Sequence, residues 1–177
     1  MRDHIRKRTK YLTVSAMLCA LSVIILSLGS LIEVLDITTA VLASLLCIYA
    51  VIEMGGAYPW LIWPVTSILA LLLLPQKTPA LFYALFAGFY PILKEKLEKL
   101  KNPLSYVLKL LVFHVSLAAI VAGMKLFFPA DLDMGDFWWM PALLYLLCLV
   151  CFVMYDFALT KLITFYLIRL RQRFRIK

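Results

Sequence analysis

Lysine and arginine residues are concentrated in three of the segments that connect the apolar stretches of this chain. About six such stretches fill its 177 residues, and a helix needs about 20 apolar residues to cross a bilayer. The basic residues of the three segments are Arg2, Arg6, Lys7, Arg8 and Lys10; Lys94, Lys96, Lys99 and Lys101; and Arg169, Arg171, Arg173, Arg175 and Lys177. In a six-span bundle all three segments lie on one side, and cytoplasmic loops accumulate lysine and arginine. The sequence therefore predicts an all-α polytopic membrane protein, a bundle of about six transmembrane helices with both termini cytoplasmic.

Composition supports the same class. Hydrophobic residues make up 64% of the chain and charged residues 16%, and a soluble domain of this size cannot cover so much apolar surface. We expect a single integral membrane domain over residues 1–177, with spans near 11–31, 37–54, 57–74, 79–92, 105–128 and 137–168. The net charge of +8 follows from this topology, so we expect contact with anionic lipids and no binding of nucleic acid.

Catalytic motifs are missing from the sequence. It contains no phosphate-binding loop and no Gly-x-Ser-x-Gly turn, which are the signatures of nucleotide hydrolysis and of serine hydrolases. His4 and His114 are far apart, and the four cysteines lie inside apolar stretches, so no metal site and no disulfide framework is expected. We predict a protein that is not an enzyme and that needs no cofactor.

Two ionisable residues are predicted at membrane depth in neighbouring spans. Lys109 lies in the fifth apolar stretch and Asp156 in the sixth, at comparable distance from the cytoplasmic side. A charge in the membrane is costly and usually faces protein or water. We therefore predict an intramembrane ion pair between Lys109 and Asp156, which would serve as a structural brace or, as the less favoured alternative, as a conformational switch.

Polar and aromatic residues also gather at the predicted outer ends of the spans. The candidates for substrate binding are Glu33, Asp36, Lys77, Tyr83, Asp136 and Tyr145. An acidic rim above aromatic walls suits a small organic solute with polar or cationic groups. The alternative, that the acidic residues are only polar caps on the outer loops, remains open.

The first apolar stretch contains a pair of small residues four positions apart, Ala16-x-x-x-Ala20. Such a step lets another helix approach closely. With about six spans, cytoplasmic ends and this step, the chain resembles the substrate-binding S components of energy-coupling factor transporters. The resemblance implies a bacterial plasma-membrane protein that binds a vitamin-like micronutrient. It also implies that Ala16 and Ala20 dock on a membrane T component, which connects to two ATPase subunits.

A second layout is also compatible with this sequence. The rod-shape-determining membrane proteins are similar in layout, and they are scaffolds that bind cell-envelope proteins and no solute. A scaffold is expected to have a collapsed outer half and a conspicuous surface elsewhere, such as the leucine-bearing linker over residues 93–102. The acidic outer loops and the alanine step favour the binding subunit, while the scarcity of polar residues in the spans favours the scaffold.

Overall fold

The computed structural model describes residues 2–98, 102–127, 139–166 and 168. The chain divides into two compact units, Met1–Pro129 and Ala130–Lys177, and each is described by itself. The expected single integral membrane domain therefore stays a prediction.

Helices account for the regular structure of the described residues in both units. The first unit contains α1 (Arg2–Leu31), the 3₁₀ turn η1 (Glu33–Leu35), α2 (Asp36–Glu53), α3 (Tyr58–Leu73), α4 (Thr78–Phe82), the π-helical turn η2 (Tyr83–Ala87), α5 (Tyr90–Leu97) and α6 (Asn102–Phe127), and the second contains α7 (Met140–Phe165). Within the described ranges, four helices (α1, α2, α6 and α7) are long and apolar enough to cross a membrane, and α3 is a shorter apolar helix. The predicted all-α class is confirmed, and a membrane location is consistent with these four helices.

Turn chemistry explains where the first helices end. Gly55 and Gly56 have φ angles of +57° and +60°, a backbone conformation that glycine adopts without the steric cost of a Cβ. They connect α2 to α3 in a tight turn, in the gap expected between the spans at 37–54 and 57–74. The gap expected between the spans at 57–74 and 79–92 is also present, because α3 ends at Leu73 and α4 begins at Thr78.

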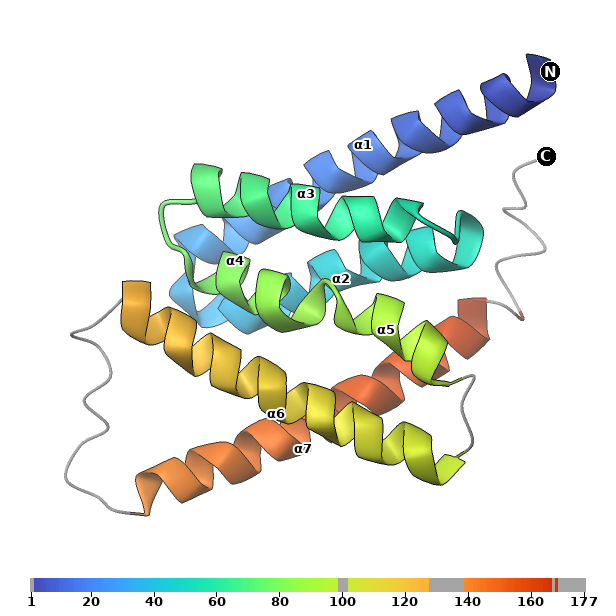
Figure 1. The fold of residues 1–177 in the computed structure, drawn as a ribbon. Helices are drawn as coiled ribbons and strands as arrows, with labels where there is room; N and C mark the ends of the chain where they lie inside the picture. The colour runs from blue at the N-terminus through green and yellow to red at the C-terminus, as the bar shows by residue number, and fades with distance from the viewer. Residues whose placement is uncertain (1, 99–101, 128–138, 167, 169–177) are drawn as a thin grey trace. The chain divides into compact units, whose positions relative to one another are not determined.

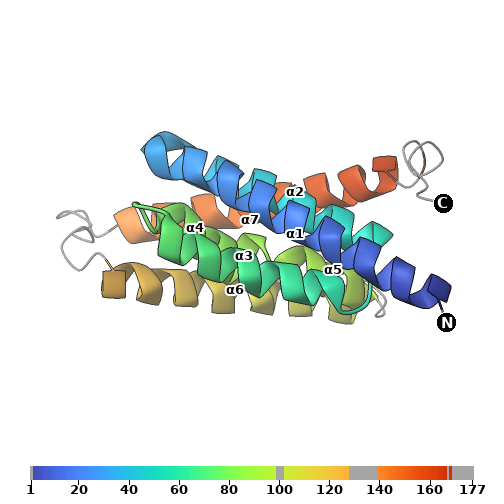
Figure 2. The ribbon, with the colours of Figure 1, turned by 90° about the horizontal axis from the view of Figure 1, so that it is seen from above.

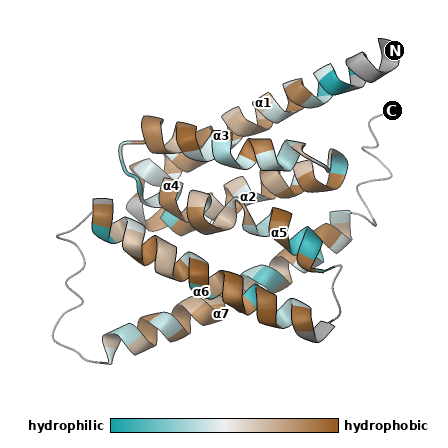
Figure 3. Cartoon of the chain, in the orientation of Figure 1, coloured by the Kyte–Doolittle hydropathy of each residue, from teal (hydrophilic) through white to brown (hydrophobic). Residues whose placement is uncertain are grey.

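In the first unit, α1 packs against both α2 and α3, and α6 packs against α4, η2 and α5. The N-terminal turns of α1 extend past the neighbouring ends of α2 and α3 in both views (Figures 1 and 2). Figure 3 colours a turn near the N-terminus of α1 and the C-terminal turns of α5 as hydrophilic, while most of the other helical residues are apolar. The C-termini of α1 and α3 lie at the same end of this unit, which we call the Ser30 end. We call the opposite end the Tyr11 end.

Small side chains form about half of the most deeply buried positions of the first unit, beside larger ones such as Tyr83, Tyr90 and Ile62. The residues that are at most 2% exposed include Ser22, Ala40, Ala43, Ser44, Ala50, Thr66, Ala70, Ala80 and Ala87. Lipid tails are as apolar as leucine, so helices in a bilayer associate through close packing rather than through the hydrophobic effect. The interior of this unit therefore has the composition of a helix bundle that is solvated by lipid.

The fourth apolar stretch differs from its prediction. We expected one helix over residues 79–92, and the structure has α4, the π-helical turn η2, Gly88 and Phe89 outside regular helix, and then α5. Pro91 has no N–H group, so it cannot donate to the carbonyl of Ala87 one turn earlier. The apolar pattern continues through this break, which is why hydropathy did not reveal it.

Candidate functional site

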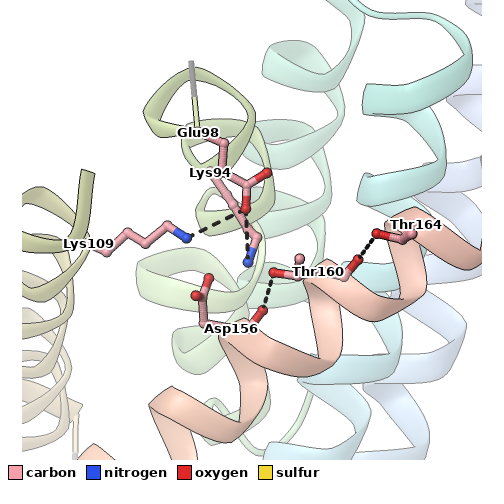
Figure 4. Close-up of polar contacts among 6 residues, drawn as sticks. All are labelled: Lys94, Glu98, Lys109, Asp156, Thr160 and Thr164. Carbon is pink, nitrogen blue, oxygen red and sulfur yellow. Dashed lines mark hydrogen bonds and ion pairs between the residues drawn. The ribbon is translucent and has the colours of Figure 1, made fainter. Parts of the chain in front are cut away.

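Three charged side chains meet between α5 and α6, and we call them the lysine cluster: Lys94, Glu98 and Lys109. The ammonium nitrogen of Lys94 lies 3.4 Å from Oε1 of Glu98, and that of Lys109 lies 3.5 Å from the same oxygen. Glu98 therefore stands between the two lysines (Figure 4). One carboxylate oxygen joins the C-terminal end of α5 to the first part of α6.

Burial makes this cluster energetically important. The side chain of Lys94 is 0% exposed and that of Glu98 is 40% exposed, while Lys109 is 8% exposed. Lys109 follows the first residue of α6 by seven positions, or about 10 Å along the axis at 1.5 Å per residue. Buried ammonium groups require close partners, since their desolvation is costly. Glu98 supplies such a contact to both lysines.

The predicted pair of Lys109 with Asp156 crosses the two units. Lys109 contacts Glu98 within the first unit, and Asp156 lies on α7 in the second. On α7, Thr160 donates a hydrogen bond of 2.9 Å to the carbonyl of Asp156, and Thr164 donates one of 2.8 Å to the carbonyl of Thr160 (Figure 4). The Lys109–Asp156 pair stays a prediction.

Two of the predicted substrate-binding residues lie at the Ser30 end of the first unit. Asp36 begins α2 and is 8% exposed, a position where the helix dipole favours a carboxylate. Nearby in sequence, the hydroxyl of Ser30 accepts a hydrogen bond of 3.0 Å from the backbone N–H of Gln76. The ammonium of Lys77 donates to the carbonyls of Leu71 and Leu74, at 2.8 Å and 2.6 Å. Lys77 thus caps the C-terminal end of α3.

This capping contact gives a prediction that separates a structural role of Lys77 from a binding role. Lys77→Met should lower the stability of the detergent-solubilised protein by about 1 kcal/mol, because the last carbonyls of α3 lose a cationic donor. That loss corresponds to a fall of about 2–4 °C in melting temperature. Lys161→Met on α7, an exposed lysine, is the control. A Lys77 variant as stable as the wild type would contradict the capping role.

The other four predicted substrate-binding residues are distributed differently. Tyr83 is 0% exposed and belongs to a core cluster that also contains Leu26 and Leu74, so it packs inside the first unit. Tyr145 is 42% exposed on α7. Glu33 lies in η1, and its side chain falls outside the described residues, as does Asp136 with its neighbours Asp131 and Asp133. The structure therefore brings together Asp36 and Lys77 at one end of one unit, and does not test their binding role.

The alanine step lies on the outward face of α1. Ala16 and Ala20 are exposed, while Ser15, Leu18, Cys19 and Ser22 on the opposite face are at most 9% exposed. Larger exposed side chains surround the two alanines, among them Leu12, Met17, Leu21 and Ile24. The result is a shallow notch of small residues that no other described helix of the first unit fills.

Comparisons with protein-family models, curated proteins and solved structures give no match for this chain. We therefore infer function from the side chains of this chain itself. Among the described residues, no group of three or more histidine, cysteine, aspartate and glutamate side chains is arranged to hold a metal ion.

From the sequence alone we did not identify two members of the lysine cluster, Lys94 and Glu98, as site residues. The sequence contains a signal for this ion pair. Lys94 and Glu98 are four residues apart in the linker over residues 93–102, and on a helix opposite charges pair at that spacing. Our interpretation of that linker rests on its leucines, as a surface for the membrane interface or a partner helix, and not on its charged residues. Leu97 and Lys94 instead face the interior of the unit, where they are 7% and 0% exposed.

Proposed function

We propose that this chain is a membrane-embedded substrate-binding subunit for uptake of a vitamin-like micronutrient, working with a separate T component and ATPase subunits. The observation that carries the proposal is the exposure of Ala16 and Ala20 on a helix whose other face is fully packed. A partner helix can approach closely only where side chains are small. The step lies where the resemblance to S components requires a docking surface.

The proposal includes a topology with both termini in the bacterial cytoplasm. The exposed residues Arg6, Arg8 and Lys10 lie at the Tyr11 end of α1, and Lys96 lies on α5, which ends at that same end of the unit. An excess of basic residues at one end supports a cytoplasmic location for that end. The Ser30 end, with Asp36 and Lys77, then faces outward and is where we place the substrate.

The docking surface can be tested with a matched control in the same chain. Ala16→Leu with Ala20→Leu should abolish co-purification of a T component and its ATPases, because two leucines fill the notch. Ala118 and Ala122 form an equally spaced exposed step on α6, so the same exchange there should leave co-purification unchanged. The measurement is a mild-detergent pull-down read by mass spectrometry, with size-exclusion profiles to establish folding. Unchanged co-purification in the α1 variant would refute docking through α1.

A specific observation favours a second candidate, the non-transporting scaffold of the rod-shape-determining type. The core cluster at the Ser30 end contains Leu26, Leu74, Tyr83 and five alanines, all at most 2% exposed. A closely packed outer half is what we expect of a scaffold. Recovery of cell-wall or division proteins without an ATPase in the same pull-down would support this candidate over the transporter subunit.

A further inference from the structure

The break in the fourth apolar stretch has a defined local structure. The N–H of Gly88 reaches back five residues and donates to the carbonyl of Tyr83 at 2.7 Å, which is the π-helical pattern. Pro91 then removes the donor for Ala87, and α5 starts at Tyr90. Single π turns and broken helices in membrane proteins are found mainly where the chain has a functional reason to depart from the regular ladder.

Side chains from two other helices donate to carbonyls at this break. Nε1 of Trp63, on α3, donates a hydrogen bond of 2.9 Å to the carbonyl of Ala84. The thiol of Cys47, on α2, donates to the carbonyl of Gly88 at 3.3 Å. Irregular backbone is tolerated in a bilayer only where protein or water satisfies its polar groups. Trp63 and Cys47 therefore stabilise the irregular backbone of the break.

Packing fixes the position of the Trp63 ring against the break. A Cβ added at Gly88 would lie 2.6 Å from Cδ1 of Trp63 and 2.8 Å from the carbonyl oxygen of Tyr83. The ring of Trp63 also contacts that of Phe89, with centroids 5.8 Å apart. Only glycine at position 88 lets the indole come this close, so its hydrogen bond to Ala84 depends on a narrow fit.

The opposite end of α5 is held by the lysine cluster. Glu98 follows the last residue of α5 and contacts Lys109 of α6. The eight residues of α5 thus form a short helix with a polar contact at each end, and five of them (Tyr90, Pro91, Ile92, Lys94 and Leu97) are buried. In hinge motions, a few residues at the ends of helices or in loops absorb the change in backbone angles while the helices move as units.

We propose that residues 84–89 form a hinge, closed by the Trp63 indole, about which α5 swings relative to α4. Opening separates the indole from the carbonyl of Ala84 and takes the carbonyl of Gly88 away from Cys47. Water then replaces both donors and reaches the Cys47 thiol, which is 0% exposed in the closed form. This hinge does not depend on either function proposed above.

The test measures access to Cys47 in native membranes. Alanine replaces Cys19, Cys148 and Cys151, and the remaining thiol is labelled with N-ethylmaleimide. Trp63→Phe keeps an aromatic ring and loses the N–H donor, so labelling of Cys47 should accelerate about tenfold, as expected when a buried hydrogen bond no longer favours the closed form. Trp139→Phe is the matched control, because Trp139 is exposed and belongs to the second unit, so this exchange should leave the labelling rate of Cys47 unchanged.

Several outcomes overturn the hinge. The first is an unchanged labelling rate of Cys47 in Trp63→Phe, and the second is an equal rise in Trp139→Phe. The third is an equal rise at Cys19, in a matching background that keeps only that thiol, since general loosening would expose both cysteines. If Trp63→Phe does not accumulate, hydrogen–deuterium exchange of the wild-type protein in nanodiscs decides. Amides of residues 84–97 should then exchange faster than those of α2, and equal protection refutes the proposal.

Discussion

Gly29→Ala should destabilise the protein, although alanine in place of a helical glycine ordinarily stabilises a helix by about 1 kcal/mol. A Cβ at position 29 would overlap the hydroxyl of Thr39 and lie 3.1 Å from its Cβ. That hydroxyl is held by the carbonyls of Leu35 and Asp36, at 3.0 Å and 3.1 Å. We expect a loss of about 2 kcal/mol, typical of an overpacked core, and a melting temperature lower by about 4–8 °C.

Gly123 provides the control for this substitution. A Cβ there would lie 3.5 Å from Leu81, an ordinary van der Waals contact, so Gly123→Ala should leave stability unchanged or raise it. Thr39→Ala should restore part of the stability of Gly29→Ala, because it removes the oxygen that the new methyl group meets. The close approach of α1 and α2 at Gly29 would be refuted if both glycine variants were equally stable.

The second large effect is expected at Glu98. Glu98→Gln removes the charge that lies 3.4–3.5 Å from the ammonium groups of Lys94 and Lys109. Breaking a fully buried ion pair from one side costs about 3–5 kcal/mol. Because Glu98 is 40% exposed, we expect about 2–3 kcal/mol and a fall of about 4–12 °C in the melting temperature in detergent.

Two further variants make this prediction specific to the lysine cluster. Glu95 lies on the same helix and is exposed, so Glu95→Gln should change the melting temperature little, as is usual for surface charges. Adding Lys109→Met to Glu98→Gln should recover part of the loss, because it removes one of the two ammonium groups that Glu98 held. A double variant that is less stable than Glu98→Gln alone would argue against the cluster.

The sequence predicted helices and turns well where a one-dimensional pattern determines them. Long apolar runs bounded by charge specified α1, α2, α6 and α7, and adjacent glycines specified the turn at Gly55. Hydropathy could not reveal the broken fourth helix, since Gly88 and Pro91 stand in a run that stays apolar on both sides. Pro91 alone was an insufficient signal, because proline also occurs inside unbroken helices of this chain, as Pro64 does in α3.

At the candidate sites, the sequence likewise could not show which residues contact each other. Depth along the spans suggested Asp156 as the partner of Lys109, yet depth does not specify which helix faces which. The structure supplies Glu98 as one partner of Lys109, from a linker that we interpreted through its leucines. Tyr83 was predicted as a wall residue, and its full burial depends on alanines contributed by three other segments. Such contacts are set by packing between distant residues and leave no local pattern.

The small side chains in the interior of the first unit also determine which substitutions this protein tolerates. Ala43, Ala50 and Ala70 are 0% exposed, so replacing any of them with leucine raises hydrophobicity and still forces two helices apart. On the exposed face of α6, exchanges among leucine, valine and isoleucine change little. Mutational tolerance will therefore follow side-chain volume rather than polarity, and sequences that diverge freely on their lipid-facing surface should keep alanine, glycine and serine at these interior positions.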